Sequence, residues 1–135
     1  MKRSEIREAV FLLLFRVEFN TEEDIPGQLE NFFDEDDLEV SVSEEEKAYI
    51  IDRAKTIVSK LSEIDKLISE KATGWTIPRM GKVDLTVIRL AVYEIVFDEE
   101  IPLGVSINEA VELAKKYGRE ESGAFVNGVL AKFGK

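Results

Sequence analysis

The chain has 135 residues, 44% of them hydrophobic and only three of them proline, which is enough to bury the core of one domain. It contains no cysteine and no histidine, which excludes thiol nucleophiles, histidine-based proton transfer, disulfides and zinc sites with thiolate or imidazole ligands. No apolar run reaches the roughly 20 residues of a transmembrane helix, so we expect a cytoplasmic protein. We expect no cofactor and no bound metal, although magnesium chemistry on carboxylates alone stays possible.

The net charge of −10 is unevenly distributed. Residues 21–46 contain twelve acidic residues and no Lys or Arg, and without them the chain has 16 acidic and 18 basic residues. A short helix is expected within this segment, from about residue 25 or 26 to 33. The run from Asp34 to Asp37 lacks the glycine and the distal glutamate of a calcium loop, so we interpret it as a solvated connector. A nucleic-acid surface is therefore possible elsewhere, but it must be local.

The first helix is expected from about Lys2 to Phe19, because apolar residues recur at helical spacing. Arg3 and Arg7 share a flank near its start. One apolar stripe consists of Ile6, Ala9, Val10, Leu13, Leu14 and Val17, and a second, nearly opposite, consists of Phe11, Leu12, Phe15 and Phe19. The second stripe is either buried under neighbouring helices or exposed as a partner-binding surface.

Ser43 to Glu46 form a capping box, which predicts the start of the longest helix, reaching about Thr73. Gly74 is expected to end it, and Pro78 favours a new helix start after the connection.

The next helix is expected from about Lys82 to Asp98, and it is almost wholly apolar. Its charged residues Asp84, Arg89 and Glu94 follow at five-residue steps, so at about 100° per residue they point in three directions and leave no polar face. Such a helix must lie among other helices.

Two shorter helices are expected to follow. A second capping box, Ser106 to Glu109, with cations and Gly118 at the other end, predicts a helix over 106–117. The last helix is expected from about Ser122 to Phe133. Phe125 lies beside its core stripe, with Lys132 on the same side, so this aromatic and cation could stack on a base or simply pack at the rim of the core. The sequence thus predicts an all-α fold of six to seven helices, in two packed sub-bundles that share the central apolar helix.

The C-terminal sequence resembles the NusB family of bacterial transcription antitermination factors. The resemblance is carried by residues 83–133, which read VDLTVIRLAVYEIVFDEEIPLGVSINEAVELAKKYGREESGAFVNGVLAKF, and above all by INEAVELAKKYG followed by FVNGVL. The opening REAVFLLLF also resembles the first helix of the family. The resemblance covers essentially the whole chain and is weakest over residues 20–60, so it implies a single RNA-binding helical domain over residues 1–135.

The resemblance implies a protein without catalytic activity that pairs with a small-subunit ribosomal protein, NusE. Together they would hold the boxA element of ribosomal RNA leaders and join the elongating RNA polymerase, with the protein itself either monomeric or homodimeric. The implied RNA contacts are Lys2, Arg3, Arg7, Phe15, Asp84 and Phe125, to which the residue pattern adds Lys132. The implied protein-partner contact is Glu121, with Asp84 and the residues Phe11, Leu12 and Phe15 of the second stripe.

Two departures from the family weaken the expected RNA contacts. Ser4 and Glu5 interrupt a cluster that holds four or five arginines in many members, and Phe15 replaces a tyrosine, which keeps the stacking face but loses the hydroxyl. An adaptor that binds only protein is the alternative function. The family's domain also occurs in ribosomal RNA cytosine methyltransferases, but the absence of cysteine and of a Gly-rich nucleotide-binding motif argues against such an enzyme.

Overall fold

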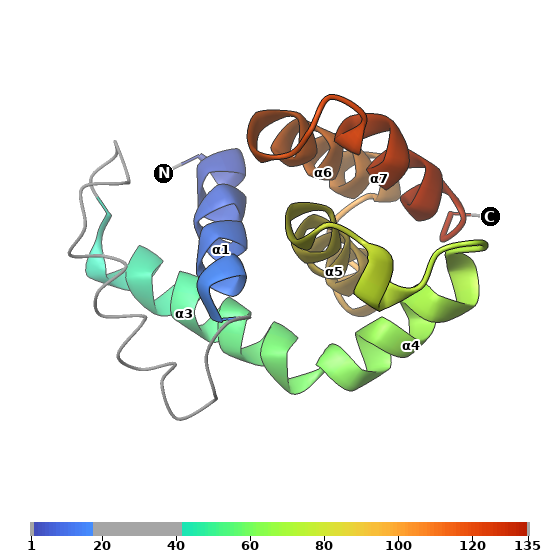
Figure 1. Cartoon of the computed structure of the whole chain (residues 1–135). Coiled ribbons are helices and arrows are strands. Elements are labelled where there is room, and N and C mark those ends of the chain that lie inside the picture. The colour runs from blue at the N-terminus through green and yellow to red at the C-terminus, as the bar shows by residue number, and fades with distance from the viewer. Residues whose placement is uncertain (1, 18–41, 135) are drawn as a thin grey trace. The chain divides into compact units, whose positions relative to one another are not determined.

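The computed structural model describes residues 2–17 and 42–134, which belong to two compact units, Met1–Val58 and Ser59–Lys135 (Figure 1). Six α-helices and one 3₁₀ helix make up the secondary structure of these ranges, and they contain no strand. The expected all-α fold is therefore confirmed. None of the described helices is both long and apolar enough to cross a membrane. The expected helix over residues 25–33 and the acidic run from Asp34 to Asp37 lie outside the described residues.

The first unit contains α1 (Arg3–Val17) and nearly all of α3 (Glu44–Ser59). The predicted core stripe of α1 is confirmed at its centre, where Ala9, Val10, Leu13 and Leu14 are buried. The predicted capping box also forms: the Glu46 N–H donates to Ser43 Oγ at 3.1 Å, and the Ser43 N–H donates to Glu46 Oε1 at 3.0 Å. These reciprocal bonds satisfy two backbone donors that a helix start leaves unpaired.

The expected single helix from Ser43 to Thr73 is wrong in one respect, because it is divided at Lys60. The backbone angles of Lys60 (φ −109°, ψ 9°) leave the α-helical region, and α4 (Leu61–Lys71) begins after it. The apolar spacing from Ile57 to Leu61 and Ile64 stays helical across this residue, so periodicity could not reveal the break. After α4 the chain turns at Gly74, whose φ of +85° is readily adopted only by glycine.

The second unit is built around α5 (Lys82–Phe97), which α4, α6 (Leu103–Tyr117) and α7 (Ser122–Ala131) all contact (Figure 1). A short 3₁₀ helix, η2 (Ile77–Arg79), containing Pro78, precedes α5. Every residue of α5 is buried from Leu85 to Ile88 and again from Leu90 to Glu94. The expectation that this helix lies among other helices is thus confirmed within its unit.

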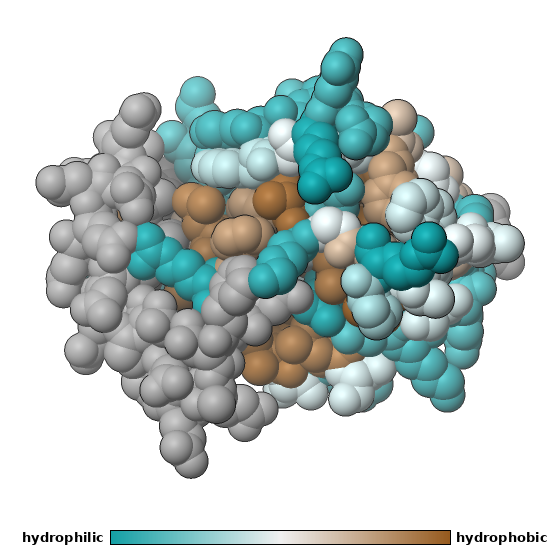
Figure 2. Space-filling view, in the orientation of Figure 1, coloured by the Kyte–Doolittle hydropathy of each residue, from teal (hydrophilic) through white to brown (hydrophobic). Residues whose placement is uncertain are grey.

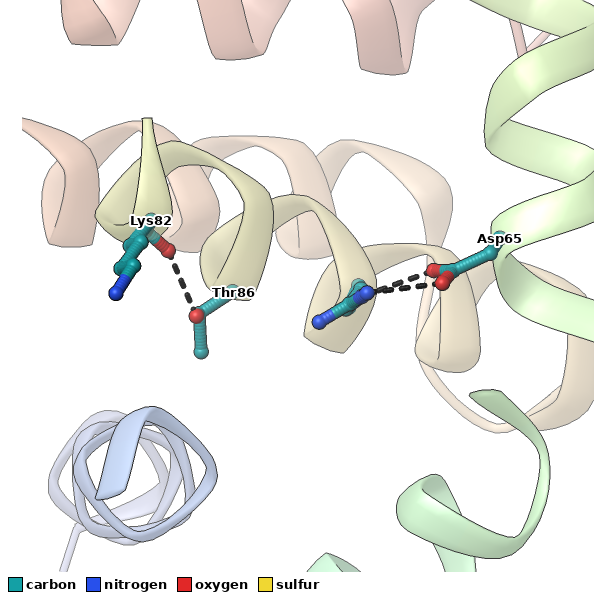
Figure 3. A network of polar contacts seen from close by, with 4 residues as sticks. Asp65, Lys82 and Thr86 are labelled. Atoms are coloured by element: carbon teal, nitrogen blue, oxygen red, sulfur yellow. Dashed lines mark hydrogen bonds and ion pairs between the residues drawn. The ribbon is translucent and has the colours of Figure 1, made fainter. Parts of the chain in front are cut away.

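Arg89 and Glu94, two charged residues of α5, each have a hydrogen-bond partner on a neighbouring helix. Arg89 donates from Nε and Nη2 to the two carboxylate oxygens of Asp65 on α4, at 2.9 and 2.8 Å (Figure 3). Glu94 is only 5% exposed and accepts a hydrogen bond of 3.0 Å from the Ser106 hydroxyl on α6. Each of these contacts ties α5 to a neighbouring helix.

The second predicted capping box is wrong. Helix α6 begins one turn earlier, with Pro102 as its N-cap residue, and Ser106 lies inside the helix. The Val105 N–H already donates to the Pro102 carbonyl at 3.0 Å, and the Ser106 side chain is buried against Glu94 rather than turned back to the helix start. Figure 2 shows hydrophilic side chains at the top of the view and apolar or near-neutral ones to their right, so the surface over α6 and α7 is mixed in character.

Candidate nucleic-acid interface

The start of α1 carries exposed positive charge on an ordered first turn. The Lys2 N–H donates to Glu5 Oε1 at 2.7 Å, and the Ile6 N–H donates to the Lys2 carbonyl at 3.0 Å. The acidic residue that interrupts the basic cluster therefore holds the helix start. Lys2 and Arg3 are exposed and Arg7 is partly exposed. Because Arg3 and Arg7 are one helical turn apart, they lie on the same side of α1.

The aromatic residues of α1 divide into a buried and a partly exposed member. Phe11 is only 1% exposed, so its ring belongs to the core, and the buried alternative left open by the sequence applies to it. Phe15 is partly exposed, and its ring centroid lies 6.1 Å from that of Phe11. Leu12 is also partly exposed. A partner could therefore reach Leu12 and Phe15, but not Phe11, on the predicted second stripe.

Asp84 occupies the first turn of α5 and is partly exposed. The N-cap residue of this helix is Gly81, which has no side chain to cap it. Because the N-terminus of a helix carries a partial positive charge, the Asp84 carboxylate stabilises α5 there, whatever else it contacts. In the same turn the Thr86 hydroxyl donates to the Lys82 carbonyl at 2.7 Å (Figure 3).

A tight turn between α6 and α7 positions Phe125. The Arg119 N–H donates to Ser122 Oγ at 2.9 Å, and the Gly118 N–H donates to the Ala114 carbonyl at 2.8 Å. A Cβ at Gly118 would lie 2.5 Å from Ser122 Oγ, so the turn requires glycine for space. Its φ of −97° needs no glycine.

The predicted residues of α7 lie at its two ends. Glu121 is the exposed N-cap residue, and its carbonyl accepts the Phe125 N–H at 3.1 Å. Phe125 is partly exposed in the first turn, and Lys132 is exposed at the C-cap. The sequence placed Phe125 and Lys132 beside the core stripe of this helix. The partial exposure of Phe125 and the full exposure of Lys132 agree with that position.

Trp75 is a neighbour of Phe125 that the sequence did not reveal. The two ring centroids are 5.0 Å apart and the rings meet edge to face, at 65°. Trp75 is 47% exposed, in the connection between α4 and η2. The only available signal was that the chain's single tryptophan stands in a connection that contains proline and glycine. Its contact with a residue 50 positions later could not be read from helical periodicity.

The predicted site residues bring cations and aromatic rings to the surface. Each unit brings a cation and an aromatic ring to its surface: Arg3 and Phe15 on α1, and Lys132 and Phe125 on α7. In residues 2–17 and 42–134, no group of three or more acidic side chains is placed to hold a metal ion. Cations bind phosphates and exposed rings stack on unpaired bases, so both sets suit single-stranded RNA.

The comparisons with known proteins agree on one family. The model of the NusB family matches residues 4–135. The transcription antitermination protein NusB of Agathobacter rectalis is 57% identical over 133 residues, covering 98% of this chain and 99% of that protein. NusB from T. maritima has a solved structure with a TM-score of 0.84 and 38% identity, which covers 98% of this chain and 90% of that one.

A further solved structure contains antitermination factors NusB and NusE in complex with dsRNA. It matches with a TM-score of 0.76 and 29% identity, over 97% of this chain and 94% of the matched chain. The likeness therefore extends over both units and includes a relative whose structure was determined with RNA and a protein partner.

Proposed function

Because the chain belongs to the NusB family, we propose that it is a transcription antitermination factor that binds boxA RNA of ribosomal RNA leaders. It does so together with a NusE-type small-subunit ribosomal protein and then joins the elongating RNA polymerase complex. The observation that carries this proposal is the match to NusB in the NusB–NusE–dsRNA structure over 97% of this chain. The protein acts by binding, in the cytoplasm, as a single domain and without catalysis.

The RNA surface has two parts under this proposal. Lys2, Arg3 and Arg7 bind phosphates at the start of α1, and Phe15 stacks on a base further along that helix. Phe125 and Lys132 form the second part on α7, and Asp84 accepts hydrogen bonds from base or sugar donors at the start of α5. The exposure of Lys2, Arg3 and Lys132 and the partial exposure of the other four residues support these assignments.

The ribosomal protein contacts Leu12, Phe15, Asp84 and Glu121. The first two supply partly exposed apolar surface, and the last two supply carboxylates. Ribosomal proteins carry many Lys and Arg side chains to neutralise RNA, so acidic contacts suit such a partner. Phe11 is left out of this surface because its ring is buried.

Charge reversal at the start of α1 tests the RNA surface. We expect Arg3→Glu and Arg7→Glu to weaken binding of a fluorescently labelled boxA RNA in an anisotropy titration, because each loses a phosphate contact and gains a repulsive charge. Lys55→Glu is the matched control: it reverses the same charge at an exposed position of α3. We expect Phe125→Ala to weaken RNA binding as well, through the loss of stacking.

Binding of the ribosomal protein separates this proposal from the adaptor. If the variants at Arg3, Arg7 and Phe125 all keep wild-type RNA affinity, the proposed RNA surface is wrong. If the wild-type chain binds the ribosomal protein but never RNA, the protein is an adaptor, and the antitermination proposal fails in its RNA part.

A further inference from the structure

Trp75 is a large exposed ring to which the proposed function assigns no role. It is the only tryptophan of the chain, and 47% of its surface is exposed. Single exposed apolar residues are common on proteins and need no explanation. This ring, however, is in edge-to-face contact with Phe125, which the proposed function already places at the RNA surface. The two rings therefore form one continuous aromatic surface.

The backbone holds Trp75 in an ordered turn. The Ala72 N–H donates to the Ile68 carbonyl at 2.8 Å and the Trp75 N–H donates to the Ala72 carbonyl at 3.2 Å, while Gly74 between them has a positive φ. On the other side, Met80 is buried, and its N–H donates to the Ile77 carbonyl at 3.1 Å. Because the backbone at Trp75 is already ordered, less conformational freedom is lost there when the ring binds a ligand.

The ring geometry leaves room for a base. In an edge-to-face pair one ring covers a single face of the other, so the partner ring leaves the remaining faces of the pair uncovered. The partial exposure of Phe125 and the larger exposure of Trp75 agree with this. An unpaired base stacks on such a face with little dependence on its identity.

Exposed charges of both signs surround the pair, because cations are exposed there as well as Glu70, Glu120 and Glu121. The contact of Trp75 with Phe125, rather than net charge, therefore favours RNA as the occupant. Lys71 and Arg79 are exposed four residues before and four residues after Trp75, and Lys132 is exposed on the helix that carries Phe125. None of these three cations forms an ion pair with another residue of the described ranges. They remain available to the phosphates on either side of a stacked base.

We propose that Trp75 and Phe125 together form one stacking site for an unpaired base of the bound RNA, with Lys71, Arg79 and Lys132 as its phosphate contacts. This inference rests on the proposed function and extends the RNA surface from α7 to the connection after α4. An apolar side chain of the protein partner is the competing occupant.

The single tryptophan makes the test direct, because its fluorescence reports on this site alone. Labelled boxA RNA is titrated into the wild-type chain, Trp75→Phe and Trp75→Ala, with and without the ribosomal protein. Anisotropy gives the affinity, while tryptophan emission and its quenching by acrylamide report on Trp75. Trp75→Phe provides the blank for any partner tryptophan, and Tyr49→Ala, at 48% exposed on α3, is the matched aromatic control.

We expect RNA to quench the Trp75 emission and to shield it from acrylamide. Trp75→Ala should weaken RNA binding roughly 5- to 150-fold, the range for loss of one stacked base, whereas Trp75→Phe should stay within about threefold of wild type. Tyr49→Ala should bind as the wild type does. Thermal unfolding of each variant confirms that a loss of affinity is not a loss of fold.

Four results would overturn the inference. RNA that binds with unchanged Trp75 emission and unchanged affinity for Trp75→Ala excludes this site but leaves the proposed function intact. Weaker binding by Trp75→Ala without any response of the wild-type emission means that Trp75 only positions Phe125. Shielding by the ribosomal protein alone, with no further change on adding RNA, assigns the site to protein. If no RNA binds under any condition, the proposed function fails together with the inference.

Discussion

Arg89 illustrates how a single residue reconciles charge with burial. It lies on a helix with no polar face, and 15% of its side chain is exposed. Both oxygens of Asp65, whose side chain is 29% exposed, face the guanidinium at hydrogen-bond distance. A bidentate pair of this kind satisfies both groups and fixes their geometry, so Arg89 aligns α5 with α4.

Removing the charge of Asp65 should destabilise the protein. We expect Asp65→Asn to lower the free energy of unfolding by about 1–3 kcal/mol, because Arg89 then keeps its partly buried charge without a carboxylate. Urea denaturation measures the change. Glu112→Gln is the control: its pair with Lys115 is long, at 3.7 Å, and exposed, so we expect a change of less than about 0.5 kcal/mol. Equal effects of the two substitutions would contradict the role assigned to Asp65.

Some features of the residues were predictable from sequence alone and others were not. Helical spacing predicted the burial at the centre of the α1 stripe and the burial of Val126, Val129 and Leu130 in the core stripe of α7. The partial exposure of Phe125 followed from its place beside that stripe. The partner of Arg89 and the contact of Trp75 with Phe125 join segments far apart in the chain. Such pairs depend on how helices pack, which a single sequence does not encode in any local pattern.

At the scale of the element, two similar motifs had different outcomes. Ser43–Glu46 forms a capping box, whereas Ser106–Glu109, with the same serine and glutamate spacing, does not. The difference lies in the neighbours of Ser106. The helix begins one turn earlier, after Pro102. The Ser106 hydroxyl instead donates to the buried Glu94, which lies 12 residues before Ser106. The serine and glutamate spacing permits a capping box, but it cannot exclude another hydrogen-bond partner for the serine hydroxyl.

Loss of the Ser43 cap should be measurable. We expect Ser43→Ala to lower the free energy of unfolding by about 1 kcal/mol, because the Glu46 N–H loses its acceptor. Ser69→Ala, at an exposed position of α4, serves as the control and should be neutral or slightly stabilising, since alanine has the higher helix propensity. A neutral Ser43→Ala would mean that the cap adds nothing to α3.

The two glycines Gly118 and Gly128 should respond oppositely to alanine. A Cβ at Gly118 would lie 2.5 Å from Ser122 Oγ and 2.7 Å from the Ala114 carbonyl oxygen, so we expect Gly118→Ala to destabilise the turn before α7. The expected loss is about 1–3 kcal/mol. At Gly128, exposed within α7, a Cβ meets nothing within 4 Å, so alanine should stabilise the helix by roughly 0.5–1 kcal/mol. Thermal unfolding of both variants checks the signs, and a stable Gly118→Ala would show that the turn is not tightly packed.

At the scale of the molecule, the distribution of charge decides what the protein can bind. The chain carries a net charge of −10, yet Lys2, Arg3 and Lys132 are exposed, and Arg7 partly so, where the proposed function needs cations. The local basic character was predictable, because the sequence confines twelve acidic residues to one segment. The sequence could not predict which of the exposed cations bind the same RNA molecule, because this depends on the bound partners.

The central claim is that the chain and its ribosomal partner bind boxA RNA as one assembly. Its most direct test is the anisotropy of a labelled boxA RNA at two salt concentrations, with and without the NusE-type protein. Tighter binding with the partner is predicted. The phosphate contacts of Lys2, Arg3 and Arg7 alone should give a slope of log affinity against log salt of about −2 on single-stranded RNA, and about −4 if Lys71, Arg79 and Lys132 also bind phosphates. RNA that fails to bind at low salt, although the ribosomal protein binds, would contradict the claim.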